Sequence, residues 1–162
     1  MTKKLGIVVP TYNRCEYLKM ALDALLPQVV EHKNAVSIVV TDNSSTDGTE
    51  AYMRGLAAAH PDVLTYYRHN ENGGYLYNFK YGIAHVDAEF VFIHGDDDMV
   101  TPYYLDYILR VLFENPNADL IHYNYFISSL DGTPIRMLYK QFSVDGFVHH
   151  YSDLFSFLEG RY

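Results

Sequence analysis

The sequence contains a single cysteine, Cys15, and this scarcity limits the architectures open to the chain. One thiol cannot form an intrachain disulfide, so a disulfide-bonded scaffold is excluded and a reducing compartment is expected. A reactive thiol would need a lowered pKa, which the start of a predicted helix could supply. A packing role is the interpretation that we adopt for Cys15.

Long apolar runs and excess basic charge are also missing. No stretch approaches the roughly 18 apolar residues of a transmembrane helix, so no membrane span is expected. The apolar run that follows Lys3 and Lys4 is too short for a secretory signal. With 12 basic and 20 acidic residues, the net charge of −8 argues against nucleic acid as a partner. The predicted location is cytoplasmic, or at the inner face of the membrane.

What the sequence does contain is an alternating pattern of short β-branched runs and amphipathic segments. Apolar residues make up 49% of the 162 residues, enough for one globular domain with a real core. Strands are expected at residues 5–9, 36–40, 63–68, 89–94 and 119–127. Helices are expected at about residues 18–29, 47–59, 76–85 and from Pro102 to 112. This alternation predicts an α/β fold with a mostly parallel sheet flanked by helices.

Four loops of this predicted sheet are unusually polar. Ligands of parallel sheets bind outside the carboxyl ends of the strands, where these loops are expected to converge. They are residues 10–14, 41–47, 68–74 and 95–98. The glycine pair of the third loop is followed neither by the Gly-Lys-Ser/Thr of a P-loop nor by a dinucleotide fingerprint, so both of those sites are excluded.

The acidic turn at residues 95–98, with the sequence Gly-Asp-Asp-Asp, is the most informative of the four. Three adjacent carboxylates repel one another unless a cation neutralises them. They follow the apolar run 90–93, so they are expected at the end of a buried strand. Oxygen ligands suit Mn²⁺ or Mg²⁺, and substrate phosphates can complete the coordination shell. The alternative is a solvated turn that favours the start of the helix at Pro102.

The other loops carry side chains suited to a nucleotide. Tyr12 offers a ring that can pack on a flat base, and Arg14 can contact a phosphate or a base. Asp42 ends a predicted strand, where its carboxylate can accept a hydrogen bond from the imide N–H of uracil. Simpler roles are also open: Asn13 and Asp47 can cap the helices that follow them.

In their order and spacing, the four loops resemble those of family 2 glycosyltransferases, which have the GT-A fold. The matching segments are residues 8–14, residues 42–49, the turn Asn72-Gly73-Gly74 and the acidic turn with Pro102 after it. The resemblance implies a Rossmann-like nucleotide-diphospho-sugar transferase domain over residues 1–127. Residues 128–162 would begin an acceptor-side region that is expected to be truncated at Tyr162.

The resemblance also implies roles for single residues. The nucleotide would be bound by Pro10, Thr11, Tyr12, Arg14, Asp42, Asn72, Gly73 and Asp96. Asp97 would be the best metal ligand, with Asp96 beside it and Asp98 supporting the turn from behind. Many members have an acid where Gly95 stands, and this departure affects how Asp96 and Asp97 divide their roles.

The implied function is metal-dependent transfer of a sugar from a nucleotide-diphosphate donor, expected to be UDP-linked, to a saccharide or lipid-linked acceptor. Polysaccharide or surface-glycan synthesis is the expectation for the family. Inversion at the anomeric carbon needs a carboxylate base, for which Asp131, Asp145 and Asp153 are available and none is singled out. The alternatives are a nucleotidyltransferase, which residues 10–13 match poorly, and a fragment that binds a nucleotide sugar without turnover.

Overall fold

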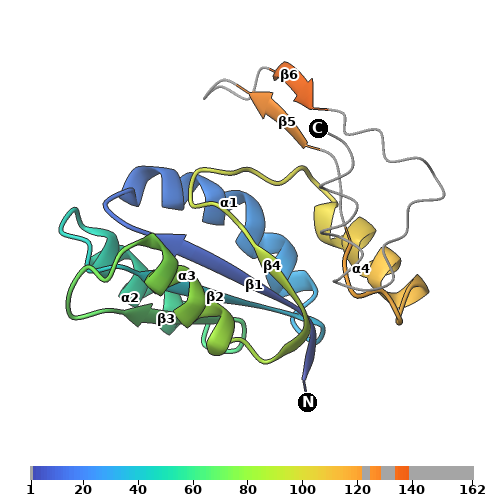
Figure 1. The fold of residues 1–162 in the computed structure, drawn as a ribbon, viewed down its shortest axis with the longest axis horizontal. Helices are drawn as coiled ribbons and strands as arrows, with labels where there is room; N and C mark the ends of the chain where they lie inside the picture. The colour runs from blue at the N-terminus through green and yellow to red at the C-terminus, as the bar shows by residue number, and fades with distance from the viewer. Residues whose placement is uncertain (1, 122–124, 129–133, 139–162) are drawn as a thin grey trace. The chain divides into compact units, whose positions relative to one another are not determined.

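The fold contains a four-stranded, all-parallel sheet with the strand order β3-β2-β1-β4 (Figure 1). The computed structural model describes residues 2–121, 125–128 and 134–138. The chain divides into two compact units, Met1–Val111 and Leu112–Tyr162, and the sheet belongs to the first. The predicted α/β fold with a parallel sheet flanked by helices is confirmed.

Strands and helices alternate along the first unit, as the sequence predicted. The strands are β1 (Lys3–Thr11), β2 (Val36–Asp42), β3 (Leu64–Arg68) and β4 (Ala88–Ile93). The helices are α1 (Cys15–Glu31), α2 (Thr49–Ala59), α3 (Tyr75–Ala84) and α4 (Tyr104–Glu114), the last of which contains the boundary between the units. β1 continues two residues past its predicted end, because its pairing with β2 extends to Thr11.

Two predictions in the later part of the chain were wrong. Pro102 does not open α4, because Tyr103 has a left-handed φ of 62° and the helix can begin only after it. The fifth strand was predicted at residues 119–127. Instead β5 (Tyr125–Ser128) pairs antiparallel with β6 (Pro134–Leu138) in a separate two-stranded sheet. Pairing with the segment that follows it in sequence needs no crossover helix, unlike addition to the parallel sheet.

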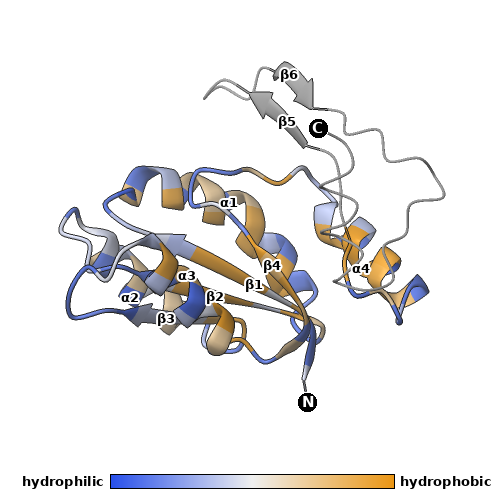
Figure 2. Ribbon diagram, in the orientation of Figure 1, coloured by the Kyte–Doolittle hydropathy of each residue, from blue (hydrophilic) through white to orange (hydrophobic). Residues whose placement is uncertain are grey.

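The core of the first unit lies between the sheet and its helices. Figure 2 shows apolar residues concentrated on the central strands β1 and β2. The predicted apolar stripe of α1 is buried throughout: Leu18, Ala21, Leu22, Leu25, Leu26 and Val29. Cys15 is buried as well, in agreement with a packing role. In the described part of the chain, no helix has the length and apolar character needed to cross a membrane.

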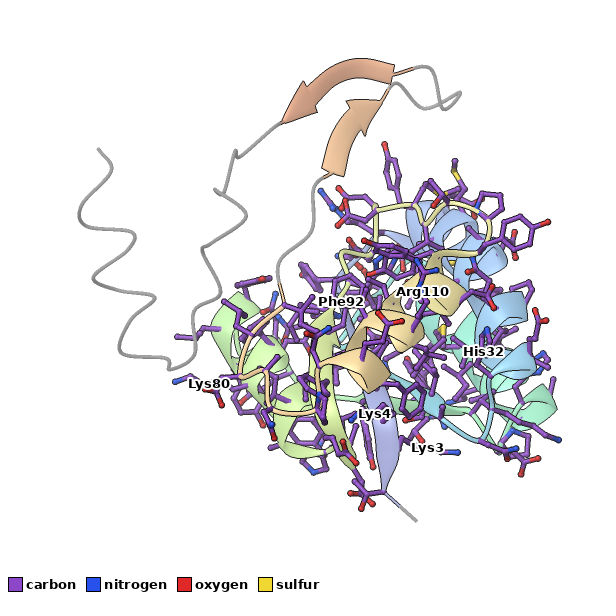
Figure 3. All side chains as sticks on the ribbon, turned by 90° about the vertical axis from the view of Figure 1, so that its right-hand side faces the viewer. Lys3, Lys4, His32, Lys80, Phe92 and Arg110 are labelled. Atoms are coloured by element: carbon purple, nitrogen blue, oxygen red, sulfur yellow. The ribbon has the colours of Figure 1, made fainter. Side chains whose placement is uncertain are left out.

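The helices cover both faces of the sheet. Lys19 of α1 lies 5.6 Å from the ring centre of Tyr52 of α2, so these two helices are neighbours. Figure 3 shows His32, at the end of α1, and Lys80 of α3 on opposite sides of the sheet. The chain builds β1, β2 and β3 in one direction and then returns to place β4 on the other side of β1. The carboxyl ends of β1 and β4 therefore form the topological switch point, where ligands of such sheets bind.

Gly82 allows α3 to approach the sheet closely. A Cβ atom at this position would lie 2.3 Å from Cγ1 of Val8 and 3.3 Å from Cγ2 of Thr41. Both neighbours are fully buried and β-branched, so they have little freedom to move aside. The absence of a side chain at residue 82 thus sets the distance between α3 and the edge that carries the polar loops.

We expect Gly82→Ala to lower the free energy of unfolding by about 1–3 kcal/mol through overpacking. Gly55 provides the matched control, because it is exposed in α2 and an added Cβ there would meet nothing within 4 Å. Gly55→Ala should raise the free energy of unfolding by about 0.5–1 kcal/mol. Urea denaturation at equilibrium measures both. Equal stabilisation by the two variants would show that α3 does not pack closely at Gly82.

Candidate functional site

The four polar loops meet at the carboxyl edge of the sheet, as predicted. The loops after β1 and β2 are joined by a hydrogen bond from the Asn13 N–H to Ser45 Oγ, with a length of 2.9 Å. The loops after β2 and β3 are joined through Asn43. Its Nδ2 donates to Asn72 Oδ1 at 2.7 Å, and its Oδ1 accepts from the Gly73 N–H at 3.0 Å.

The loop after β1 also binds the acidic turn that follows β4. Thr11 Oγ1 donates to Asp96 Oδ2 at 2.8 Å. Arg14 Nη1 lies 3.1 Å from Asp96 Oδ1 and 2.7 Å from Asp97 Oδ2. The hydrogen bond and charge of Asp96, followed by those of Asp97, raise the pKa of Arg14. Arg14 thus supplies the positive charge that these adjacent carboxylates require.

Asp97 is the carboxylate best placed to take a metal ion. Its side chain is 48% exposed, whereas that of Asp96 is 8% exposed and bound on both oxygens. Asp98 folds back toward Gly95, whose N–H donates to Asp98 Oδ2 at 3.3 Å. Among the residues that the structure describes, no three His, Cys, Asp or Glu side chains form a ready metal cluster. The residues therefore fit an ion held by one or two carboxylates and completed by phosphate oxygens.

His94, which precedes the acidic turn, is a buried side chain. Burial lowers the pKa of His94, although the charges of Asp98, Asp96 and Asp97 oppose that effect. Its Nε2 atom has no hydrogen-bond partner within residues 2–121. An imidazole with a lowered pKa is uncharged near pH 7. In contrast to Arg14, His94 therefore supplies no positive charge to the acidic turn.

Asp42 is completely enclosed at the end of β2. Its Oδ1 accepts from the Ser45 N–H at 2.8 Å, and its Oδ2 accepts from the Tyr66 hydroxyl at 2.7 Å. Arg68 Nε lies 3.7 Å from the same Oδ2. Burial, with this hydrogen bond, raises the pKa of Tyr66 far above its usual value. The base contact predicted for Asp42 stays a prediction, and a base would share the carboxylate with these donors.

Tyr66 was missed by sequence reasoning. Residues 66 and 68 lie on the same face of β3 because side chains alternate along a strand. The register that pairs Asp42 with Arg68 then brings both side chains to the Asp42 carboxylate. The alternation was readable in the sequence, but the pairing of β2 with β3 in that register was not.

Asn78 of α3 ties together the ends of β1 and β2. In the structure it is buried, and its Nδ2 donates to the carbonyl oxygens of Thr11 and Thr41 at 3.3 and 2.9 Å. Its Oδ1 lies 3.0 Å from His69 Nε2. Asn78 is a structural link beneath the loops.

The remaining predicted residues lie on the same edge. Tyr12 is 44% exposed, which leaves its ring available for stacking. Pro10 is partly buried near the end of β1. Asn72 Oδ1 accepts from the Gly74 N–H at 2.8 Å, so side-chain amides occupy the N–H groups of the glycine-rich turn. That arrangement is typical of turn chemistry. The possible bases Asp131, Asp145 and Asp153 lie outside the described residues.

Asp47 serves two helix starts. Its Oδ2 accepts from the Cys15 N–H at 2.9 Å, and its Oδ1 accepts from Thr49, whose N–H is 3.2 Å away and whose hydroxyl is 2.6 Å away. The alternative role of Asn13 as a cap of α1 is not found. Asn13 has a left-handed φ of 53°, and its amide oxygen accepts instead from the Thr46 N–H.

The model of Glycosyl transferase family 2 matches residues 6–158. The chain belongs to this family. The match includes all four polar loops, and the predicted family resemblance is thereby confirmed.

Two relatives of this family 2 chain are uncharacterised glycosyltransferases of Rickettsia. One, from Rickettsia felis, is 29% identical over 135 residues, which are 83% of the chain and 21% of the relative. The other, from Rickettsia bellii, is 32% identical over 120 residues, which are 74% of the chain and 16% of the relative. The chain therefore spans a minor part of the length of these curated relatives.

Solved structures of nucleotide-sugar transferases share the fold. The mannosyltransferase PcManGT from Pyrobaculum calidifontis, in complex with GDP-Man and Mn²⁺, superposes with a TM-score of 0.60 and 28% identity, covering 69% of this chain and 33% of that one. S. aureus TarS 1–349 in complex with UDP-GlcNAc gives a TM-score of 0.61 and 25% identity, covering 71% and 32%. The predicted GT-A fold of the family 2 chain is confirmed.

The two caps made by Asp47 lead to a stability prediction. Burial alone would raise the pKa of Asp47, but hydrogen bonds from Thr49 and Cys15 outweigh it and lower the pKa. We expect Asp47→Ala to lower the free energy of unfolding by about 1–2 kcal/mol near pH 7. A lowered folded-state pKa stabilises the fold above the unfolded-state pKa, about 3.9, and this contribution is lost as the pH falls through the folded value.

The measurement is chemical denaturation at several pH values, with Asp23→Ala as the control. Asp23 is an exposed carboxylate in the middle of α1, so its removal should change stability by less than about 0.5 kcal/mol. A deficit in Asp47→Ala that grows as the solution is acidified would contradict the assignment.

Proposed function

We propose that this chain binds the nucleotide diphosphate of a sugar donor at the carboxyl edge of the sheet and that Mn²⁺ or Mg²⁺ links the diphosphate to the acidic turn. The main support is the position of Asp97. It is a half-exposed carboxylate beside Arg14, at the switch point between β1 and β4 of a family 2 sheet. When bound, the cation would neutralise charge on the diphosphate leaving group.

In this proposal, different loop residues contact different parts of the donor. The exposed ring of Tyr12 stacks on the base, and Asp42 accepts a hydrogen bond from the base once the Tyr66 hydroxyl is displaced from its Oδ2. Thr11 keeps Asp96 in place, while Asp97 ligates the metal ion. Pro10, Asn72 and Gly73 line the nucleotide, and Asp98 supports the turn through Gly95.

The proposed donor is UDP-linked. The Asp42 carboxylate and the Asn43 amide beside it can match an imide N–H between two carbonyl groups, as uracil presents, once the base displaces their present partners Tyr66 and Asn72. The structural neighbours are complexes with GDP-Man and with UDP-GlcNAc, so both bases occur among related folds. Guanine also presents an N–H donor, and the two nucleotides therefore need to be compared directly.

The proposed reaction transfers a hexosyl group to a hydroxyl of a saccharide or lipid-linked acceptor with inversion at the anomeric carbon. It would belong to polysaccharide or surface-glycan synthesis in the cytoplasm or at the inner face of the membrane. The base that deprotonates the acceptor is left unassigned. A second candidate function is nucleotide-sugar binding at the same edge without turnover. Family membership favours both over a nucleotidyltransferase.

Isothermal titration calorimetry with UDP, in the presence and absence of Mn²⁺, tests the proposal. We expect UDP to bind more tightly when Mn²⁺ is present, and Asp97→Asn to weaken the Mn²⁺-dependent part by at least about tenfold. Asp62→Asn is the control, because it removes one carboxylate from an exposed position before β3. It should bind UDP and Mn²⁺ as the parent chain does.

Titration with GDP under the same conditions compares the two bases. Tighter binding of GDP than of UDP would overturn the choice of donor and leave the site in place. The absence of binding by either nucleotide, with or without Mn²⁺, would overturn the proposed function.

A further inference from the structure

The positive charge of Arg14 lies at the start of a helix, where a cation is otherwise disfavoured. It is the N-cap residue of α1, and the start of a helix carries a partial positive charge. Asp47, not Arg14, provides the side-chain oxygen that accepts from the first N–H of the helix. The position of the guanidinium is therefore stabilised by the acidic turn and not by the helix.

The carboxylate oxygens that Arg14 contacts are those that a divalent cation would need. Asp96 Oδ2 already accepts from Thr11, which leaves Asp96 Oδ1 and the Asp97 carboxylate. Arg14 Nη1 lies 3.1 and 2.7 Å from Asp96 Oδ1 and Asp97 Oδ2. A divalent ion bound to the same oxygens would lie only a few ångströms from the guanidinium, and two positive charges so close repel strongly. Arg14 and the cation therefore compete for this pair of carboxylates.

The guanidinium can leave the carboxylates without being buried. The Arg14 side chain is 48% exposed, and its guanidinium carbon lies 5.8 Å from the centre of the Tyr17 ring. A diphosphate offers anionic oxygens that bind an arginine in a bidentate manner. Asp96 and Asp97 would then lose their guanidinium partner and need another cation.

We infer that Arg14 is a placeholder cation, which occupies Asp96 and Asp97 until the diphosphate of the donor binds it, and that it thereby couples binding of the divalent cation to binding of the nucleotide. This inference rests on the proposed function. Without nucleotide, Arg14 weakens cation binding. With nucleotide, Arg14 contacts phosphate and the cation takes its place on the carboxylates. The coupling is reciprocal, so each ligand raises the affinity of the other by the same factor.

The test is the affinity for Mn²⁺ in the complete absence of nucleotide, measured by electron paramagnetic resonance of free Mn²⁺. We expect Arg14→Gln to bind Mn²⁺ about tenfold more tightly than the parent chain, because a unit charge beside the carboxylates is removed. Arg54→Gln is the control, since Arg54 pairs with Glu50 and not with the acidic turn. It causes the same change in net charge and should leave Mn²⁺ affinity unchanged. Thermal melting verifies that both variants are folded.

A second titration with UDP present measures the coupling. The factor by which UDP raises Mn²⁺ affinity should be smaller in Arg14→Gln than in the parent chain. Arg14→Lys, which keeps the charge but loses the planar guanidinium, should lie between them. If Arg14→Gln binds Mn²⁺ no more tightly than the parent chain while both bind UDP with Mn²⁺, the placeholder role is overturned and the proposed function stands. If no protein binds Mn²⁺ or UDP, both fail.

Discussion

The hydrogen bond from Thr11 to Asp96 joins β1 to the acidic turn after β4 beyond the point where the two strands pair, and the geometry of the candidate site depends on it. β1 and β4 pair until Val8 and Ile93, and β1 then continues to Thr11 in its pairing with β2. Both partners of the bond are buried, and they are 85 residues apart in sequence. With Asp96 held in this way, the next residue, Asp97, faces outward beside the loop of β1. The fold thus exposes the carboxylate of Asp97 and buries that of Asp96.

The loops around this bond are closed by side chains. Asn43 pairs with Asn72 and the Gly73 N–H, and Asn78 reaches the carbonyl groups beneath the loops. Asp47 binds the first N–H groups of two helices at once. Hydrogen bonds of this kind fix loop conformations before a ligand binds, which lowers the conformational entropy lost on binding. Arg14 is the half-exposed cation at this edge, and it can respond to an anionic ligand.

Membership of family 2 gives this geometry a chemical context. In the proposed function, an exposed ring, an acid at a strand end and an acidic turn together hold the nucleotide diphosphate. Recognition of the acceptor and removal of its proton require further groups, which the described residues do not identify. The proposed donor site uses described residues alone, and titration tests it without a measurement of transfer.

The order of elements, the buried stripe of α1 and the four polar loops could be predicted from the sequence, because periodicity and strand-end position are local properties. The acidic turn could also be recognised, since adjacent carboxylates after an apolar strand are unusual. The identity of the cation beside the acidic turn could not be predicted from the sequence. Three features depend on which segments become neighbours in space. Arg14 rather than a histidine neutralises Asp96 and Asp97, Tyr66 and Arg68 enclose Asp42, and β5 pairs with β6. Contacts between residues distant in sequence are decided by packing of the whole sheet and its helices, and only the tertiary structure shows them.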